Sequence, residues 1–193
     1  MLEYNEETRV HYIDGIKVPS VTSVLPKEDI YVSAEVYESA RIDGVDRHIR
    51  IERYLDSRDT NFDLMLEKFA EMIDEIRPGK MLIHEQPLFS RKHMFCGKPD
   101  VIFESAIWDI KRSFGKSRRH ALQLAAYDIL REENGMGTTN EWWIIVWDGR
   151  QWKRRNVYTK YQESRKWFLT LLEFYHYYYP QRKREAGDGA QAV

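Results

Sequence analysis

Residues 97–113, GKPDVIFESAIWDIKRS, constrain the fold of this chain more than any other segment. Their apolar residues form two short strand-like runs on either side of residues 104–105, and this pattern predicts a β-hairpin. Asp100, Asp109 and Lys111 interrupt the apolar runs. Because a buried charge is costly unless it is paired or binds a metal, the hairpin must provide partners for these three side chains.

A turn centred on residues 104–105 places Asp100 opposite Asp109 in the hairpin. Directly opposed residues of an antiparallel pair project from the same side, with Cβ atoms about 4.5–5.5 Å apart. Lys111 follows Asp109 by two positions and therefore projects from that side as well. We expect this charged face to line a surface cleft. The apolar residues that alternate with it are expected to face the core: Val101, Phe103, Trp108 and Ile110.

The charged face of the hairpin has two interpretations. Two carboxylates this close repel each other unless a proton or a cation lies between them, and Mg²⁺ or Mn²⁺ would be a suitable cation. With a lysine that holds a phosphate oxygen or positions a water, the set suits metal-assisted hydrolysis of a phosphodiester. The alternative is an exposed edge hairpin in which Asp100 and Asp109 face solvent and Lys111 forms a cross-strand salt bridge.

The rest of the chain predicts a fold in which helices surround a sheet. The expected elements are a hairpin turning at residues 14–15, helices over about 33–55 and from a cap at Asp59 or Thr60 to 77, a strand over 81–89, the charged hairpin, a helix over 117–133, two strands turning at 148–149, and a helix over 161–179. This order predicts an α/β or α+β fold with a central mixed β-sheet flanked by helices, plus an N-terminal hairpin and helical segment. We expect one domain over residues 1–180, with its core at about 33–158, and a disordered tail over 181–193.

Composition restricts the possible partners and cofactors. The chain of 193 residues has a net charge of -1, yet residues 111–120, KRSFGKSRRH, hold five Lys or Arg residues and no acid. This run matches a phosphate track or a solvated loop. The single cysteine, Cys96, is expected to be buried and inert, and it excludes an iron–sulfur cluster that needs several thiolates. No leader or membrane-spanning run is apparent, so we expect a cytoplasmic protein with no membrane partner.

Four further motifs follow one another in a defined order, from about residue 15 to residue 130. Residues 98–100 and 109–111, KPD and DIK, resemble the signature of the PD-(D/E)XK nuclease superfamily. Residues 123–127, QLAAY, resemble the Gln-x-x-x-Tyr motif of its RecB-like branch, and residues 44–55, GVDRHIRIERYL, its Gly-x-x-x-His helix. The remaining two motifs resemble that branch's acidic strand entry and the start of small phage-encoded members: HEQPLF at 84–89 and GIKVPSVTSVL at 15–25.

This resemblance implies a restriction-endonuclease-like core and a set of residue roles. His48, Asp100 and Asp109 would bind Mg²⁺ or Mn²⁺, with the Ile110 carbonyl as a further ligand. Asp100, Asp109 and Lys111 would form the catalytic set, with Lys111 as the catalytic lysine. A helical histidine that simply packs against its neighbours is the alternative for His48.

Other roles implied by the resemblance stay open at this point. Glu85 either binds the metal through water or only bridges to a basic neighbour. Gln123 and Tyr127 would contact DNA or brace the site, although one helical turn separates them and they could simply cover a packed face. The DNA-binding set would be completed by basic residues of the neighbouring run: Lys116, Arg118 and Arg119.

The function implied is a metal-dependent DNA nuclease of the phage exonuclease type, acting in recombination or end processing in the bacterial host cytoplasm. DNA would be its substrate, and a phage recombinase or single-strand annealing protein would be its partner; the oligomeric state is left open. One alternative is a structure-selective or restriction-like endonuclease. An alternative of another class is a catalytically inactive DNA-binding or assembly subunit that retains a relic of the site.

Overall fold

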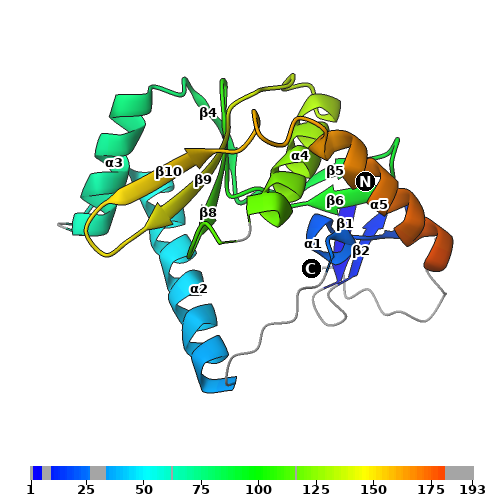
Figure 1. Cartoon of the computed structure of the whole chain (residues 1–193), viewed down its shortest axis with the longest axis horizontal. Coiled ribbons are helices and arrows are strands. Elements are labelled where there is room, and N and C mark those ends of the chain that lie inside the picture. Colours follow the sequence, from blue (N-terminus) through cyan, green and yellow to red (C-terminus); the bar gives the residue numbers. More distant parts are fainter. Residues whose placement is uncertain (1, 6–9, 27–33, 62, 116, 181–193) are drawn as a thin grey trace.

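A computed structural model describes residues 2–5, 10–26, 34–61, 63–115 and 117–180 (Figure 1). The chain begins with a small antiparallel sheet and a short helix: β1 (Leu2–Asn5), β2 (Val10–Ile13), β3 (Ile16–Val18) and α1 (Val21–Val24). The predicted hairpin turn is confirmed between β2 and β3. Asp14 and Gly15 both have positive φ, 51° and 77°, as the central residues of a type I′ turn require.

A five-stranded mixed sheet forms the centre of the fold, as predicted. Its strand order is β10-β9-β8-β7-β4, and only β8 and β9 are parallel neighbours. The helix α4 (Ser117–Glu133) connects these two parallel strands, as a parallel crossover requires. The bounds of the five strands are β4 (Met81–His84), β7 (Val101–Phe103), β8 (Ile107–Lys111), β9 (Trp142–Trp147) and β10 (Trp152–Asn156).

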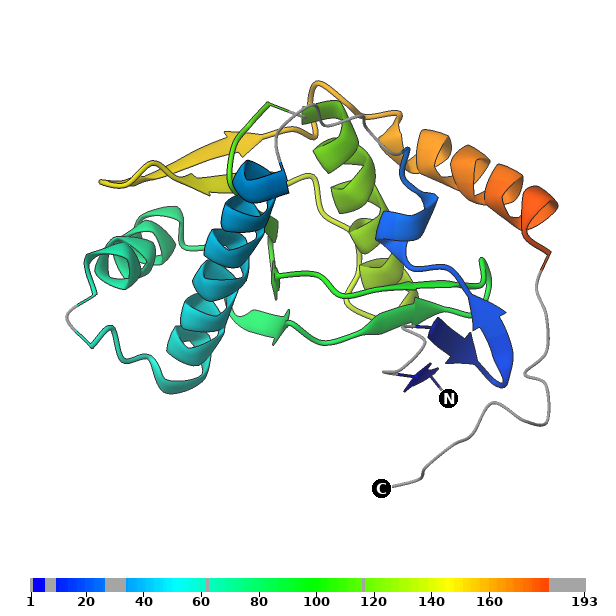
Figure 2. The same cartoon turned by 90° about the horizontal axis from the view of Figure 1, so that it is seen from below.

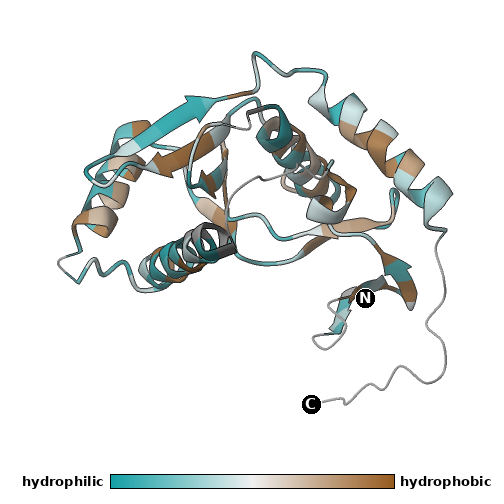
Figure 3. Ribbon diagram, turned by 60° about the horizontal axis from the view of Figure 1, so that its bottom comes forward, coloured by the Kyte–Doolittle hydropathy of each residue, from teal (hydrophilic) through white to brown (hydrophobic). Residues whose placement is uncertain are grey.

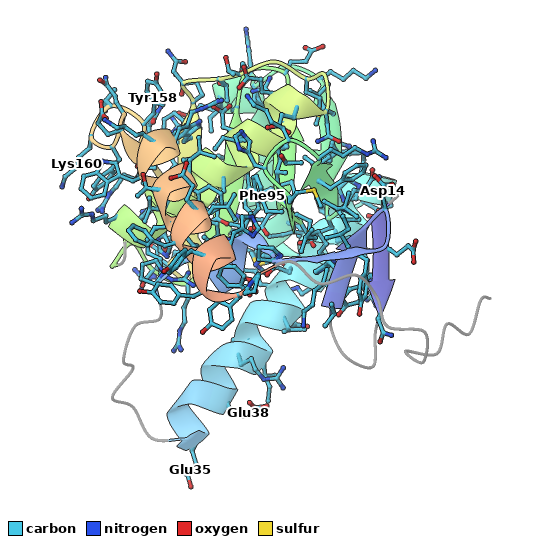
Figure 4. The ribbon with its side chains drawn as sticks, turned by 90° about the vertical axis from the view of Figure 1, so that its right-hand side faces the viewer. Asp14, Glu35, Glu38, Phe95, Tyr158 and Lys160 are labelled. Atoms are coloured by element: carbon cyan, nitrogen blue, oxygen red, sulfur yellow. The ribbon has the colours of Figure 1, made fainter. Side chains whose placement is uncertain are left out.

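Helices cover both faces of this sheet (Figure 2). The C-terminal half of α2 (Ala34–Ser57) and α3 (Leu64–Ile76) cover one face, where Ile51 and Phe69 pack against Trp108. The other face is covered by α4, with α1 and α5 (Ser164–Tyr178) beyond it, and Ile107 lies in this second core. The N-terminal end of α2 extends away from the rest of the molecule and carries Glu35 and Glu38 (Figure 4).

One edge of the central sheet, the strand β10, differs in polarity from its interior. Figure 3 shows the edge strand β10 as hydrophilic beside the apolar strand β9. The exposed residues of β10 include Lys153, Arg154 and Arg155. Charged residues on an edge strand oppose pairing with a further strand, so this edge ends the sheet.

The predicted register of the charged hairpin is confirmed, but one consequence drawn from it is wrong. Val101 pairs with Trp108 and Ile102 with Ile107, as a turn at residues 104–105 requires. Asp109, however, does not line a surface cleft, because α4 covers its side of the sheet and its side chain is 0% exposed. On the charged side of β8, Asp109 is therefore enclosed by the apolar core, whereas Lys111 at the end of the strand is partly exposed.

The strand expected over residues 81–89 is interrupted at Glu85. This residue has a φ of 46°, and its N–H donates to the carbonyls of Pro99 and Asp100, each at 3.1 Å. After this break the chain leaves the central sheet and forms a separate two-stranded sheet of β5 (Leu88–Ser90) and β6 (Phe95–Gly97). The backbone kink therefore directs the Glu85 side chain independently of the strand alternation.

Two helices begin later than expected. Asp63, rather than Asp59 or Thr60, caps α3, because its carboxylate accepts from the N–H groups of Met65 and Leu66. The last helix begins at Ser164, after a turn in which the Tyr161 N–H donates to the Val157 carbonyl.

Several predictions fall on residues that the structure does not describe. These are the start of the first long helix at residue 33, the position of Lys116, and the disordered tail over residues 181–193. Among the helices that are described, none has the length and apolar character needed to cross a membrane.

The packing of β6 against α4 gives a testable prediction at Gly97. A Cβ atom at this position would lie 2.7 Å from Val21 Cγ2, 2.9 Å from Tyr127 Cε1 and 3.1 Å from Leu130 Cδ1. We expect Gly97→Ala to lower the free energy of unfolding by about 1–3 kcal/mol, the usual cost of overpacking a core. Urea unfolding followed by circular dichroism measures this.

Gly44→Ala is the matched control, because a Cβ at Gly44 would meet no heavy atom within 4 Å. Gly44 lies inside α2, where alanine is favoured over glycine by about 0.5–1 kcal/mol, so this variant should be neutral or more stable. Equal unfolding midpoints for Gly97→Ala and wild type would contradict the close packing of β6 on α4.

Candidate metal centre

Three side chains from distant parts of the chain meet beside the start of β7. His48 lies on α2, Glu85 follows β4, and Asp100 precedes β7. One ligand atom from each lies within 4.8 Å of the others. His48 Nδ1 is 3.2 Å from Glu85 Oε1 and 3.6 Å from Asp100 Oδ1. An imidazole and two carboxylates in this arrangement offer the nitrogen and oxygen ligands that Mn²⁺ accepts.

Local structure fixes each of these three side chains. Ile51 is buried one turn after His48 and holds that part of α2 against the sheet. The left-handed backbone of Glu85 orients its carboxylate. Asp100 accepts a hydrogen bond of 2.6 Å from the Ile110 N–H through Oδ2, which leaves Oδ1 toward His48. β8, the second strand of the hairpin, thus positions Asp100, which directly precedes the first strand, β7.

A second charged group, Asp109 and Lys111, lies on β8. Lys111 Nζ is 2.7 Å from Asp109 Oδ1. Asp109 Oδ2 is buried and has no hydrogen-bond partner among the described residues. A buried carboxylate oxygen without a partner costs free energy, and a cation or an ordered water would remove that cost. The residues present therefore fit a divalent cation in this cluster.

Burial and like charge destabilise the ionised form of Asp100. Burial raises the pKa of Asp100 to about 6, and the negative charge of Asp109 acts in the same direction. The positive charges of Lys111 and His48 oppose this rise but do not cancel it. For Lys111, burial lowers the pKa, whereas the charges of Asp109 and Asp100 raise it more, so its ammonium form is favoured.

For His48 and Glu85, at the more exposed side of the cluster, ion pairing changes the pKa more than burial does. Burial lowers the pKa of His48, but the hydrogen bond to Glu85 and the charge of Asp100 outweigh it, and the pKa is raised overall. Burial raises the pKa of Glu85, but its hydrogen bonds to His48 and Lys98 lower the pKa overall. In the absence of a metal, a protonated His48 partly neutralises the carboxylates that surround it.

Both roles that the sequence left open for Glu85 have support in the geometry. Glu85 lies in the close group with His48 and Asp100, and its Oε2 is also 2.6 Å from Lys98 Nζ. Sequence reasoning gave no role to Lys98 beyond its place in the KPD motif. Its position directly before Pro99 and Asp100 was the available signal for a cation beside the cluster.

The structure brings only some of the predicted metal ligands into one close group. His48 and Asp100 lie in the close group, whereas Asp109 lies next to it and pairs with Lys111. Ile110 is connected to the site through its N–H, and a role for its carbonyl stays a prediction.

Gln123 and Tyr127 lie in the interior rather than on an open surface. Gln123 Nε2 donates a hydrogen bond of 2.9 Å to the Tyr127 hydroxyl, and both side chains are buried. Burial raises the pKa of Tyr127 well above its usual value, and the negative charges of Asp109 and Asp100 add to this. The burial of both side chains argues against a direct contact with DNA, whereas bracing the site and covering a packed face both fit their position.

Arg118 and Arg119 lie at the start of α4 and line a groove of about 960 Å³ between α4 and α5. The Arg118 guanidinium lies over the exposed Trp167 ring, 5.2 Å from its centroid. Arg119 Nε donates to the Pro26 carbonyl at 3.3 Å, and its charge acts on Lys111. The basic groove thus begins near the charged end of β8.

No protein-family model and no curated protein matches the sequence. Chemical interpretation therefore depends on the geometry of the cluster. The cluster combines potential metal ligands, a lysine ammonium and nearby arginines, a combination that suits anionic phosphate substrates.

The raised pKa of Asp100 predicts how stability depends on pH without metal. Its folded-state pKa, about 6, exceeds the unfolded value near 3.8, so the contribution of Asp100 to the free energy of unfolding falls as pH rises through this interval. Asp100→Asn cannot ionise and should therefore exceed wild type in free energy of unfolding by about 1–3 kcal/mol at pH 7.5 in EDTA. The difference should disappear near pH 4.

Thermal and urea unfolding at both pH values measure this effect. Asp46→Asn is the control, because Asp46 is exposed on α2 and pairs only weakly with Arg50, at 3.4 Å. It should change stability by less than about 0.5 kcal/mol at either pH. A wild type more stable than Asp100→Asn at pH 7.5 in EDTA would show that Asp100 is not destabilised by burial.

Proposed function

We propose that this protein is a metal-dependent nuclease that hydrolyses phosphodiester bonds of DNA. The observation that carries the proposal is the joining of two groups in one cluster: the metal-ligating set His48, Glu85 and Asp100, and the buried pair Asp109 and Lys111. A purely structural salt bridge would not require the unpartnered Asp109 Oδ2 or the closely spaced carboxylates.

The proposal includes a restriction-endonuclease-like core of the PD-(D/E)XK type. The mixed sheet supports it, since Asp100 and Asp109 flank a hairpin of β7 and β8, and α4 then crosses to the parallel strand β9. The order of the sequence motifs supports it independently. His48 on the preceding long helix lies in the group with Glu85 and Asp100, and the charges of Asp109 and Asp100 act on Tyr127 of α4; both observations support the proposal.

The residues of the cluster would divide the work of hydrolysis. His48, Glu85, Asp100 and Asp109 would hold Mg²⁺ or Mn²⁺, which when bound stabilises charge on phosphoryl oxygens and lowers the pKa of an attacking water. Asp109 keeps Lys111 protonated and oriented. The Lys111 ammonium would hold a phosphate oxygen or position the water, and cleavage would leave a 5′-phosphate.

We favour an exonuclease that processes DNA ends in recombination, in the cytoplasm of a bacterial host. Such an enzyme would supply processed DNA to a phage recombinase or single-strand annealing protein. A structure-selective or restriction-like endonuclease would use the same cluster, so the form of the DNA that is cut distinguishes the two. An inactive DNA-binding subunit would bind DNA through the same basic residues without cutting it.

The role of Lys111 predicts a large loss of cleavage in Lys111→Gln. This variant keeps an N–H donor on the side chain but removes the positive charge that offsets the buried Asp109 carboxylate, so it should be less stable than wild type. Its rate is therefore compared with wild type at a temperature at which circular dichroism shows both to be folded. With Mn²⁺, the cleavage rate should fall about 10²–10³-fold, the usual cost of removing one group that stabilises transition-state charge. End-labelled linear DNA and closed circular DNA, tested in parallel, measure both the rate and the mode of cleavage.

Lys68→Gln provides the matched control, since Lys68 lies on α3, pairs with Glu71 at 2.7 Å and belongs to neither group of the cluster. It should cut at the wild-type rate. Digestion of linear DNA alone would support an exonuclease, and nicking of circles would support the endonuclease. Failure of wild type to cut any form of DNA with Mn²⁺ would overturn the nuclease proposal and favour the inactive subunit.

The basic groove predicts a change in the salt dependence of DNA binding. If Arg118 and Arg119 each neutralise a phosphate, the double change to glutamine should reduce the slope of log K against log salt by about 0.9 per lost contact on duplex DNA. The loss should be similar for unrelated DNA sequences. Fluorescence anisotropy in EDTA between about 50 and 200 mM salt measures it. Arg150→Gln, on the β9–β10 turn, is the control and should leave the slope unchanged. An unchanged slope in the Arg118 and Arg119 double variant would show that the basic run does not contact phosphates and is only a solvated segment.

A further inference from the structure

A second cavity, of about 530 Å³, opens beside the metal cluster. Its size lies within the range of about 300–1,000 Å³ in which proteins bind small ligands. The N-terminal sheet, α1, β6 and α4 all contribute to it. Its polar and aromatic lining consists of Tyr4, His11, Ser20, Thr22, Lys98 and Tyr127.

Two residues connect this cavity with the cluster. Lys98 lines the cavity and forms an ion pair with Glu85, 2.6 Å from Nζ to Oε2. Tyr127 lines it as well and lies within the field of the Asp100 and Asp109 carboxylates. A DNA strand with one phosphate at the cluster could therefore place its next nucleotide in this cavity, past the Lys98 ammonium.

An aromatic pair lies in the lining of the cavity. Tyr4 on β1 and His11 on β2 are cross-strand partners, and their rings stack with centroids 4.7 Å apart and an interplanar angle of 29°. Tyr4 is 51% exposed although it carries a large apolar ring. His11 Nδ1 is buried and has no hydrogen-bond partner in the described part of the chain. The pair thus offers both a ring surface and polar groups at the cavity.

We propose that this cavity binds an unpaired nucleobase of the strand that is cut, with Tyr4 and His11 as its stacking surface. This inference rests on the proposed nuclease function and names the form of its substrate. Aromatic rings bind successive bases of single strands by stacking, with little dependence on sequence. A base in a duplex has both faces covered by its neighbours and its edge paired, so it must separate from its partner to enter the cavity.

The cavity therefore selects DNA whose end is single-stranded or has opened. Lys98, which lines the cavity and pairs with Glu85, holds the phosphate between the cluster and the cavity. The enzyme would bind and cut single strands and overhanging ends more readily than blunt duplex.

Binding is tested without cleavage, with fluorescein-labelled single-stranded DNA and the matching blunt duplex in EDTA. Tyr4→Ala should weaken single-strand binding about 5- to 150-fold, the range observed when one stacked aromatic is removed. Tyr4→Phe keeps the ring and should restore wild-type affinity. Tyr177→Ala removes an exposed tyrosine of α5 outside the cavity and should bind as wild type does. Duplex affinity should change less than twofold in all three variants.

The outcomes separate the subsite from the nuclease proposal. Loss of single-strand affinity in Tyr4→Ala, with rescue in Tyr4→Phe, supports the subsite even if wild type cuts no DNA with Mn²⁺. Unchanged single-strand affinity in Tyr4→Ala overturns the subsite even if wild type cuts DNA. Equal losses on single strands and duplex also overturn it, because they would assign Tyr4 to general backbone binding. His11→Ala provides a second test, with a loss again expected on single strands alone.

Discussion

The Asp109 carboxylate lies fully buried between the central sheet and α4, with one oxygen on Lys111 and the other without a partner among the described residues. Asp100 is held on the same side of the hairpin by the Ile110 N–H, and the two negative charges oppose each other's ionisation. Such an arrangement costs stability, and the lysine offsets only part of the cost. The fold must therefore be stable enough without this site, and its two apolar cores on either face of the sheet provide that stability.

The surrounding elements can be understood from the need to complete this charged site. The left-handed backbone at Glu85 removes the chain from the central sheet and brings a third carboxylate to Asp100. The long helix α2 is anchored in the core through Ile51, which lets His48 reach the same point. On the side of the site opposite α2, Gly97 allows β6 to pack closely against Tyr127 of α4, and α4 covers that side. Structural elements from the whole chain thus meet at one charged cluster and an adjoining cavity.

Local sequence patterns predicted most of the fold. The Asp14-Gly15 turn, the hairpin register and the helix over residues 117–133 depend on local backbone preferences and alternation, and the structure confirms them. The break at Glu85 was missed, because its positive φ accompanies hydrogen bonds that the Glu85 N–H donates to the carbonyls of Pro99 and Asp100, which lie later in the chain. The burial of Asp109 was missed for a related reason: hairpin alternation defines two faces, but the helix that covers the second face follows later in the chain. The grouping of His48 with Asp100, and with Glu85 as an open candidate, was expected from the family resemblance and not from local patterns, because it depends on long-range packing.

The central claim, that the buried charges form a divalent-cation site, is tested most directly by a crystal structure of the protein soaked in Mn²⁺, with anomalous scattering used to locate the ion. We expect one ion at direct bonding distance, about 2.0–2.5 Å, from His48 and Asp100, with Asp109 Oδ2 or Glu85 completing the protein ligands. An ion more than about 6 Å from His48, or no ion in the cluster at saturating Mn²⁺, would contradict the claim, because neither position allows a bond to the imidazole.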